Sequence, residues 1–334
     1  MEQGGSPAIA RAAPLRAILP ILQIVVMLLA AGMARAEVDY PLRPVTMVVP
    51  LPAGGTADLL CRFAADKAGA LLGQTVVVEN RPGGAGGRIG TEQVMRAPPD
   101  GYTLLCAPQL TFSITHLVFT KFDTRPLEPV SVLATYPLIL LARPGAPFDS
   151  TAELVAYGRA NPGKVNYGHQ GKGNTGHLLG ELLMLKGSFR MTEVPYRGSA
   201  PAINDLIAGN IDLVPDYLLA NKGSIDAGKL KLIGTGSRER LKDYPAVATI
   251  AETLPGVYAD TWMAVAAPPG TSDEIRQKMS DAIRQGFAQP DLRARILGLE
   301  AEPLGSSPAA MRDMIAKSLA AWGPVVEAAK IVVE

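Results

Sequence analysis

Short apolar runs alternate with helical patterns in the first third of the chain. Residues 45–49 form an apolar, largely β-branched run. The segment 50–58 that comes next is rich in proline and glycine, and apolar residues then recur at helical spacing to about residue 72. Two more apolar runs, at 76–80 and 102–106, are separated by another helical pattern. This order predicts β-α-β-α-β, and therefore a parallel sheet covered by helices.

The chain after residue 130 predicts a second group of the same kind. An apolar stretch at 130–143 is longer than an ordinary strand, as expected for a segment that passes from one lobe into another. A strand at 165–168 is followed by a glycine-rich loop at 169–176 and by a helix, and the chain returns near 258–266. The sequence therefore predicts an α/β fold of two lobes with two crossings between them. Such a hinge leaves a cleft at the carboxyl ends of the strands.

The loop at 50–58 predicts an anion site. A tight turn between a buried strand and a helix exposes unpaired backbone N–H groups and the positive end of the helix dipole. These groups bind a carboxylate without a cationic side chain. The alternative is a turn that only connects strand to helix. The second glycine loop, at 169–176, favours the functional interpretation.

The N-terminal segment has the pattern of a secretory signal peptide. Arg11 and Arg16 precede an almost wholly apolar run at 17–31, and Ala34-Arg35-Ala36 is a small-x-small cleavage site. A membrane anchor is the alternative, but the apolar run is shorter than the roughly 20 residues of a membrane span. We therefore expect cleavage after Ala36 and export to the periplasm.

Charge and composition exclude several classes of function. Removing the signal's three arginines and one glutamate from the 32 basic and 31 acidic residues leaves a formal charge of −1. No basic field is left to attract nucleic acid. The glycines at 83–90 resemble a dinucleotide fingerprint only superficially. No nucleophile elbow or catalytic triad is present, so we expect neither an enzyme nor a cofactor.

The two cysteines and three histidines do not form a zinc motif. Cys61 and Cys106 could be oxidised in an exported protein, but both stand among apolar residues, which favours buried free thiols. The histidines, with these cysteines, match no recognised zinc spacing, so no metal is expected. His169 and Lys172 could supply positive potential for a dianion, although a solvated loop is the default for Lys172.

Several motifs follow one another along the chain after the signal. They are Tyr40-Pro41-x-Arg43-Pro44, the loop at 50–58, Val76-Val77-Val78-Glu79-Asn80-Arg81-Pro82-Gly83, Pro99-Asp100-Gly101-Tyr102-Thr103, 161–168, Val194-Pro195-Tyr196-Arg197-Gly198, and the strand with Trp262. In this order they resemble the Bug receptors, the solute-binding proteins of tripartite tricarboxylate transporters. The resemblance covers nearly the whole chain after the signal.

The resemblance implies a type II periplasmic binding protein whose two lobes close on a small carboxylate. The expected lobes are 37–137 plus 261–334 and 138–260, after a signal at 1–36. Carried over by motif, the implied ligand-binding residues are Ala53, Gly54, Gly55, Asp58, Thr111, Gly171, Gly173, Asn174, Thr175, His177 and Asp216. His169 joins them as a source of positive potential. The family commonly has serine where His169 and Gln170 stand, which leaves the ligand's identity open.

The sequence leaves the roles of three residues open. Asp58 either caps its helix or contacts ligand waters. His177, in a first helical turn, is more consistent with packing or capping than with proton donation. An acid at Asp216 would accept from a ligand hydroxyl or ammonium, and it would repel a second carboxylate unless bridged or protonated.

The expected partners are a small carboxylate and membrane permease subunits. The carboxylate could be a di- or tricarboxylate, an aromatic carboxylate or an amino acid. We expect a monomer that binds no nucleic acid. The alternatives are a periplasmic sensor or adaptor for a signalling receptor that uses the same pocket and, less favoured, a secreted α/β enzyme.

Overall fold

One long strand, β4 (Glu128–Ala142), is shared by two sheets. The computed structural model describes Met1, Gly4, 39–54 and 56–333. Contacts divide the chain into two units, Met1–Asp39 and Tyr40–Glu334, and every described helix and strand belongs to the second. From Glu128 to Pro137, β4 pairs antiparallel with β9 (Asp260–Ala267), and from Leu138 to Ala142 it pairs antiparallel with β7 (Leu213–Tyr217). Because β4 is buried almost throughout, its apolar character on both faces is explained.

The first sheet has the strand order β2-β1-β3-β9-β4. β1 pairs in parallel with β2 and β3, and β9 runs antiparallel to β3. The short β10 pairs with the other edge of β4. The bounds are β1 (Val45–Val49), β2 (Val76–Asn80), β3 (Thr103–Pro108) and β10 (Glu302–Pro303).

Helices cover both faces of this sheet. α2 and α10 pack against each other on one face. On the other face, Val94 of α3 and Met311 of α12 share a core with Val48, Leu105 and Trp262. The bounds are α2 (Thr56–Leu72), η1 (Ala85–Gly87), α3 (Arg88–Met95), the π-helical turn η2 (Leu110–Ile114), α4 (Thr115–Val118), α10 (Asp273–Phe287), α11 (Pro290–Leu297) and α12 (Pro308–Ala328).

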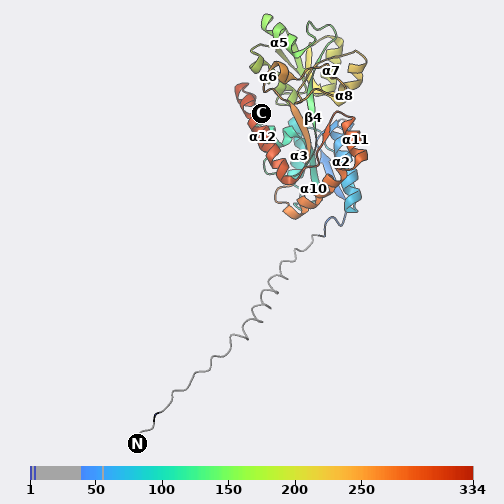
Figure 1. Cartoon of the computed structure of the whole chain (residues 1–334), viewed down its shortest axis with the longest axis vertical. Helices are drawn as coiled ribbons and strands as arrows, with labels where there is room; N and C mark the ends of the chain where they lie inside the picture. The colour runs from blue at the N-terminus through green and yellow to red at the C-terminus, as the bar shows by residue number, and fades with distance from the viewer. Residues whose placement is uncertain (2–3, 5–38, 55, 334) are drawn as a thin grey trace. The chain divides into compact units, whose positions relative to one another are not determined.

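The second sheet is built on the last part of β4. β7 pairs with β4 and β5, β5 pairs in parallel with β6, and β8 pairs with the opposite edge of β4. Figure 1 shows α5 to α8 gathered around this sheet, with β4 leading to the α2, α3 and α10 end. The bounds are β5 (Asn166–His169), β6 (Thr192–Pro195), β8 (Lys231–Thr235), α5 (Thr151–Ala160), α6 (Thr175–Gly187), α7 (Ser199–Ala208), α8 (Leu218–Asp226) and α9 (Ile250–Thr253).

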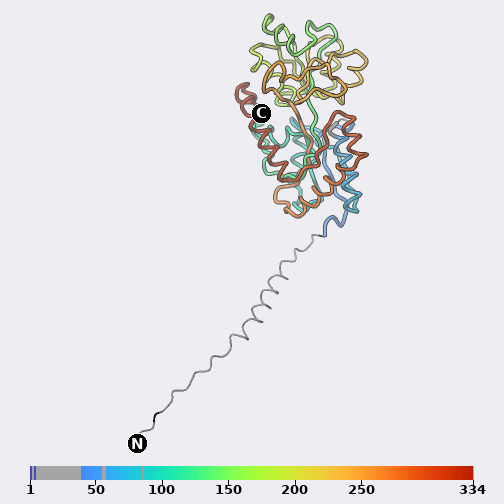
Figure 2. Tube along the Cα trace, in the orientation of Figure 1, coloured from blue at the N-terminus to red at the C-terminus, as the bar shows by residue number. Residues whose placement is uncertain are grey.

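The C-terminal helix α12 packs against elements of both β/α groups. It contacts β4 and η2 along its length, and it contacts α6 near its end. Trp322 and Val325 of α12 belong to the same core cluster as Leu179 and Leu183 of α6. The trace in Figure 2 shows this last helix returning beside the second group of elements. The two β/α groups are therefore connected by α12 as well as by β4 and β9.

The α/β class and the two β/α groups predicted from the sequence are confirmed. The predicted boundaries between lobes stay a prediction. The signal at 1–36, its cleavage after Ala36, and Gly55 lie outside the described residues. Among the described residues, no helix has both the length and the apolar character of a membrane span.

The expectation of free cysteine thiols is wrong. Cys61 of α2 and Cys106 of β3 form a disulfide, with their Cα atoms 6.0 Å apart. Both residues are fully buried, as the apolar surroundings indicated. Sequence context predicts burial, but it does not show that α2 crosses β3 where the two thiols meet.

Candidate functional site

The first glycine loop is held in place by the carboxylate of Asp58. Gly54 N–H donates to Asp58 Oδ2 over 3.0 Å, and Arg62 Nε donates to the same oxygen over 2.9 Å. Asn80 Nδ2 donates both to Asp58 Oδ1 (2.9 Å) and to the carbonyl of Leu51 (3.1 Å). In this conformation the Gly54 amide is therefore paired within the protein, and Asp58 acts as an anchor for the loop.

Asp58 stays ionised at neutral pH. Burial by itself raises the pKa of this carboxyl, but the hydrogen bonds from Arg62, Gly54 and Asn80 outweigh it and hold the pKa below its usual range. The side chain is almost fully buried, whereas Ala53 and Gly54 are exposed. A second carboxylate near this loop would therefore have to bind through donors that Asp58 does not occupy.

Two histidines hold the second glycine loop in a similar way. Gly171 N–H donates to His169 Nδ1, and Gly173 N–H donates to His177 Nδ1, each over 3.1 Å. Burial lowers the pKa of both imidazoles, and neighbouring His169 helps to bring the pKa of His177 to about 4. Both rings are therefore neutral at pH 7. Their expected roles as sources of positive charge or ligand contact stay untested.

The start of α6 is connected to β4 through two tyrosines. Asn174 caps the helix, because its Oδ1 accepts from Gly176 N–H over 2.8 Å. Thr175 Oγ1 lies 2.9 Å from Tyr217 Oη, and the Tyr217 ring meets Tyr136 of β4 edge-on, with centroids 5.4 Å apart. Tyr136 stands just before the point where β4 changes its pairing partner. The loop is thus positioned by the strand that both sheets share.

Gly173 lies where the second loop packs against α4. Its φ is +76°, a left-handed conformation that favours glycine. A Cβ added there would lie 2.4 Å from Val118 Cγ1 and 3.6 Å from Val333 Cγ2. No side chain larger than hydrogen fits without a shift of these neighbours. The contact joins a loop of the second sheet to a helix that follows β3 of the first.

Asp216 is a buried carboxylate with partners of its own. It accepts hydrogen bonds from the Ser199 hydroxyl and from Tyr217 N–H, the latter over 2.9 Å. Burial raises its pKa, and the bonds from Ser199 and Tyr217 oppose this rise. Ser199 is the first residue of α7, and Leu218 begins α8 directly after Tyr217. Its predicted contact with a ligand hydroxyl or ammonium stays a prediction.

Thr111 has an unusual side-chain environment. Its carbonyl accepts from the Thr124 hydroxyl, but its own Oγ1 is buried and without a hydrogen-bond partner in the described residues. Buried polar atoms are nearly always paired in folded proteins. Thr111 is therefore a polar group that is still able to bond, shortly after the end of β3. Its implied contact with the ligand stays a prediction.

The cavities among the described residues are lined by segments other than the two glycine loops. One, of about 500 Å³, lies between α6 and α12 and is bordered by Glu181, Arg190 and Val325. Another, of about 380 Å³, is bordered by Tyr136 and Asp260 and by residues after β8 and α11. The expectation that the two glycine loops face each other across a cleft therefore stays a prediction.

The sequence reasoning missed several partners of the predicted residues. Asn80, Ser199 and Glu193 were not singled out, although each bonds to a residue that was. The position of Asn80 could have been predicted from the sequence, because Asn80 ends the strand that pairs with β1 and therefore lies beside the first loop. Ser199 and Glu193 approach their partners only through the tertiary arrangement.

Comparisons with known proteins agree on one family. Residues 60–331 match the sequence model described as "Tripartite tricarboxylate transporter family receptor". The structure is similar to that of the periplasmic binding protein BugD, at 33% identity over 87% of this chain and 99% of BugD, with a TM-score of 0.77.

Two of the similar structures contain dicarboxylates. One is Rhodopseudomonas palustris Rpa4515 with adipate, at 32% identity over 88% of this chain and 100% of that chain, with a TM-score of 0.80. The other is MatC from Rhodopseudomonas palustris with bound malate, at 31% identity over 86% of this chain and 100% of that chain, with a TM-score of 0.76.

Proposed function

Because this chain belongs to the receptor family of tripartite tricarboxylate transporters, we propose that it is a periplasmic receptor that captures a small organic carboxylate and delivers it to the transporter's membrane subunits. The observation that carries this proposal is the similarity, over nearly the whole described chain, to two structures solved with dicarboxylates. We infer that the protein binds without chemical turnover and acts as a monomer, and that its signal is cleaved after Ala36.

The proposed site uses the two strand–glycine loop–helix units. One carboxylate oxygen meets N–H groups near Ala53 to Gly55 at the start of α2. The other end of the ligand meets the start of α6 at Asn174 and Thr175. Helix starts leave several N–H groups without intrahelical partners, and the helix dipole favours an anion there. Gly54, Gly171 and Gly173, whose amides are paired in this conformation, hold the loops in position.

Charged side chains modify the selectivity of this site, whereas backbone N–H groups supply its main contacts. Asp58 and Asp216 are the protein's own carboxyls near the two proposed contact regions, and each is hydrogen-bonded within the protein. Lys172, on the second loop, adds positive potential that favours a dianion over a monoanion. The proposed ligand class is accordingly a dicarboxylate, with tricarboxylates, aromatic carboxylates and carboxylate-bearing amino acids as the competitors to be tested.

The two lobes are proposed as 37–137 plus 261–334 and 138–260. β4 exchanges β9 for β7 as its pairing partner between Pro137 and Leu138, which supports the first boundary. A ligand that contacts both lobes binds the closed form more tightly than the open one and shifts the equilibrium toward it. The closed form is then the state that the membrane subunits recognise.

A calorimetric and thermal-shift screen of carboxylates tests the proposed function. We expect at least one four- to six-carbon dicarboxylate to bind with 1:1 stoichiometry and a Kd of about 1 μM or lower, as several charge-assisted hydrogen bonds provide. At a ligand concentration 100 times Kd, the free energy of unfolding should rise by about 2.7 kcal/mol.

Diols of the same chain length are the matched control ligands, and they should have no effect. If no di- or tricarboxylate, aromatic carboxylate or amino acid stabilises the protein, the proposed function is wrong.

A further inference from the structure

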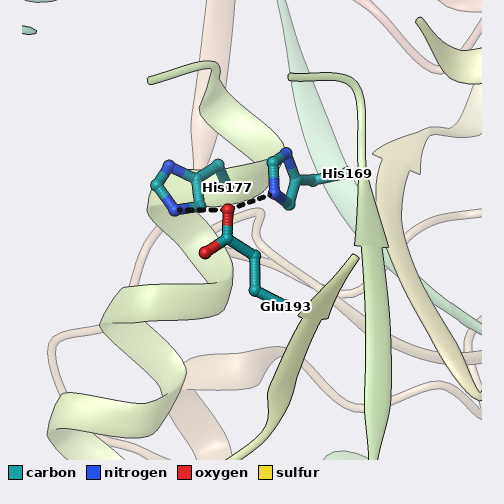
Figure 3. Close-up of side chains that lie close together, drawn as sticks. All are labelled: His169, His177 and Glu193. Atoms are coloured by element: carbon teal, nitrogen blue, oxygen red, sulfur yellow. Dashed lines mark hydrogen bonds and ion pairs between the residues drawn. The ribbon is translucent and has the colours of Figure 1, made fainter. Parts of the chain in front are cut away.

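Three side chains from three elements converge beside the second glycine loop. Figure 3 shows His169 from the end of β5, His177 from α6 and Glu193 from β6 pointing toward one another. Glu193 Oε1 lies 2.9 Å from His169 Nε2 and 3.6 Å from His177 Nε2. One ligand atom from each side chain can be chosen so that all three lie within 4.8 Å of one another. We call these three residues the His–Glu cluster.

A second carboxylate stands next to the His–Glu cluster. Glu181 Oε1 lies 3.8 Å from His177 Nε2, and it is oriented by a 2.9 Å hydrogen bond from Tyr167 Oη. Glu181 is one turn along α6 from His177, so both side chains lie on the same face of the helix. The group thus contains two imidazoles and two carboxylates, the donor types that Zn²⁺ takes in proteins.

The His–Glu cluster is open to solvent at Glu193. Charges of both signs surround it, because the carboxylates of Glu181 and Glu193 lie beside the imidazoles and Lys172 and Arg190 lie near Glu181. His169 is fully buried, whereas the Glu193 side chain is 29% exposed, so an ion could enter from the Glu193 side.

We propose that His169 Nε2, His177 Nε2 and the Glu193 carboxylate form a Zn²⁺ site, with Glu181 as the fourth ligand. With Zn–N and Zn–O distances of about 2.0–2.2 Å, tetrahedral ligands stand roughly 3.3–3.6 Å apart. The separations from Glu193 to His169 (2.9 Å) and to His177 (3.6 Å), and from Glu181 to His177 (3.8 Å), lie close to these values. The site goes beyond the carboxylate receptor function and does not depend on it.

Zinc at this site is coupled to the second glycine loop through the imidazole tautomers. Each Nδ1 accepts a backbone N–H, so in the neutral rings the proton is on Nε2. Zinc takes the lone pair of Nε2, and each ring then keeps its single proton on Nδ1. A protonated Nδ1 cannot accept from Gly171 or Gly173. Zinc therefore releases both amides and changes the conformation of the loop, with no net proton lost.

Isothermal titration with ZnCl₂ tests the site on the purified protein without a polyhistidine tag. We expect one Zn²⁺ per chain with a Kd of about 10 μM or lower. Glu193→Gln keeps a hydrogen-bond acceptor for His169 but removes the charge, and it should weaken binding at least tenfold. His177→Gln should do the same. His116→Gln is the matched control, because His116 is the only histidine outside the cluster, and it should leave the affinity unchanged.

Amide spectra supply the second measurement. In the wild type, the ¹H–¹⁵N signals of Gly171 and Gly173 should shift on zinc addition, and Glu193→Gln should need at least ten times more zinc for the same shift. A wild-type Kd above about 10 μM, a Glu193→Gln affinity within tenfold of the wild-type affinity, or unchanged glycine signals would each overturn the proposal. In those cases the cluster is only a hydrogen-bonded support for the loop.

Discussion

Removal of the disulfide should lower the free energy of unfolding by about 4 kcal/mol. Cys61 and Cys106 are 45 residues apart, and closing a loop of that length removes roughly this much conformational entropy from the unfolded chain. The bond joins α2 to β3, in the half of the molecule that holds the first glycine loop. We expect the reduced protein to unfold at a clearly lower guanidinium concentration than the oxidised protein.

Two forms of the protein separate the cross-link from packing. Reduced wild type keeps both buried sulfur atoms and loses only the bond, whereas the Cys61→Ala/Cys106→Ala variant loses the sulfur packing as well. The variant should therefore be somewhat less stable than reduced wild type, and reductant should not affect it. A change below 1 kcal/mol on reducing the wild type would show that this bond contributes little to stability.

The substitution Gly173→Ala should weaken carboxylate binding by about 10- to 100-fold. The new Cβ would lie 2.4 Å from Val118 Cγ1, so the second loop must move away from α4. Such a shift misplaces the start of α6 and loses about one charge-assisted hydrogen bond, or roughly 1.5–3 kcal/mol of binding free energy. Calorimetry with the carboxylate identified by screening measures the effect.

Two further variants separate steric displacement from backbone strain. Gly209 also has a left-handed φ, +81°, but the nearest heavy atom to an added Cβ is Arg143 Cδ at 4.0 Å. Gly209→Ala should therefore lose roughly 1–2 kcal/mol of stability and keep full affinity. Val118→Ala, which removes the clashing methyl, should restore most of the affinity of Gly173→Ala. Equal affinities for Gly173→Ala and wild type would rule out the role assigned to this loop.

The sequence was sufficient to predict the first strands and the long strand at 130–143 because each follows from a local pattern, whereas the short helices η2, α4, α8 and α11 were not predicted. The β-branched run at 45–49 and the buried run at 130–143 appear as β1 and β4 close to their expected bounds. Asn174, expected only as a ligand-binding residue, also caps α6. The long run at 130–143 and the return near 258–266 also predicted two lobes, and the similar structures confirm the fold class.

Features that depend on residues far apart in the chain could not be predicted from the sequence. The disulfide required knowledge of where α2 crosses β3. Likewise, nothing local to His169 indicates that Glu193 stands 2.9 Å from it, since two separate strands must first pair in register. Asp58 was expected as a cap or a ligand contact, and its bonds to Gly54 and Asn80 show a third role as the anchor of its own loop.

The proposed receptor function requires that one carboxylate ligand bridges the two glycine loops. Titration of isotope-labelled protein with the best dicarboxylate, followed by ¹H–¹⁵N spectra, is the decisive experiment. We expect amide signals at 53–55 and at 171–175 to shift together and to saturate with the same Kd, equal to the calorimetric value. Shifts confined to one loop, or different Kd values for the two loops, would disprove the bridging arrangement.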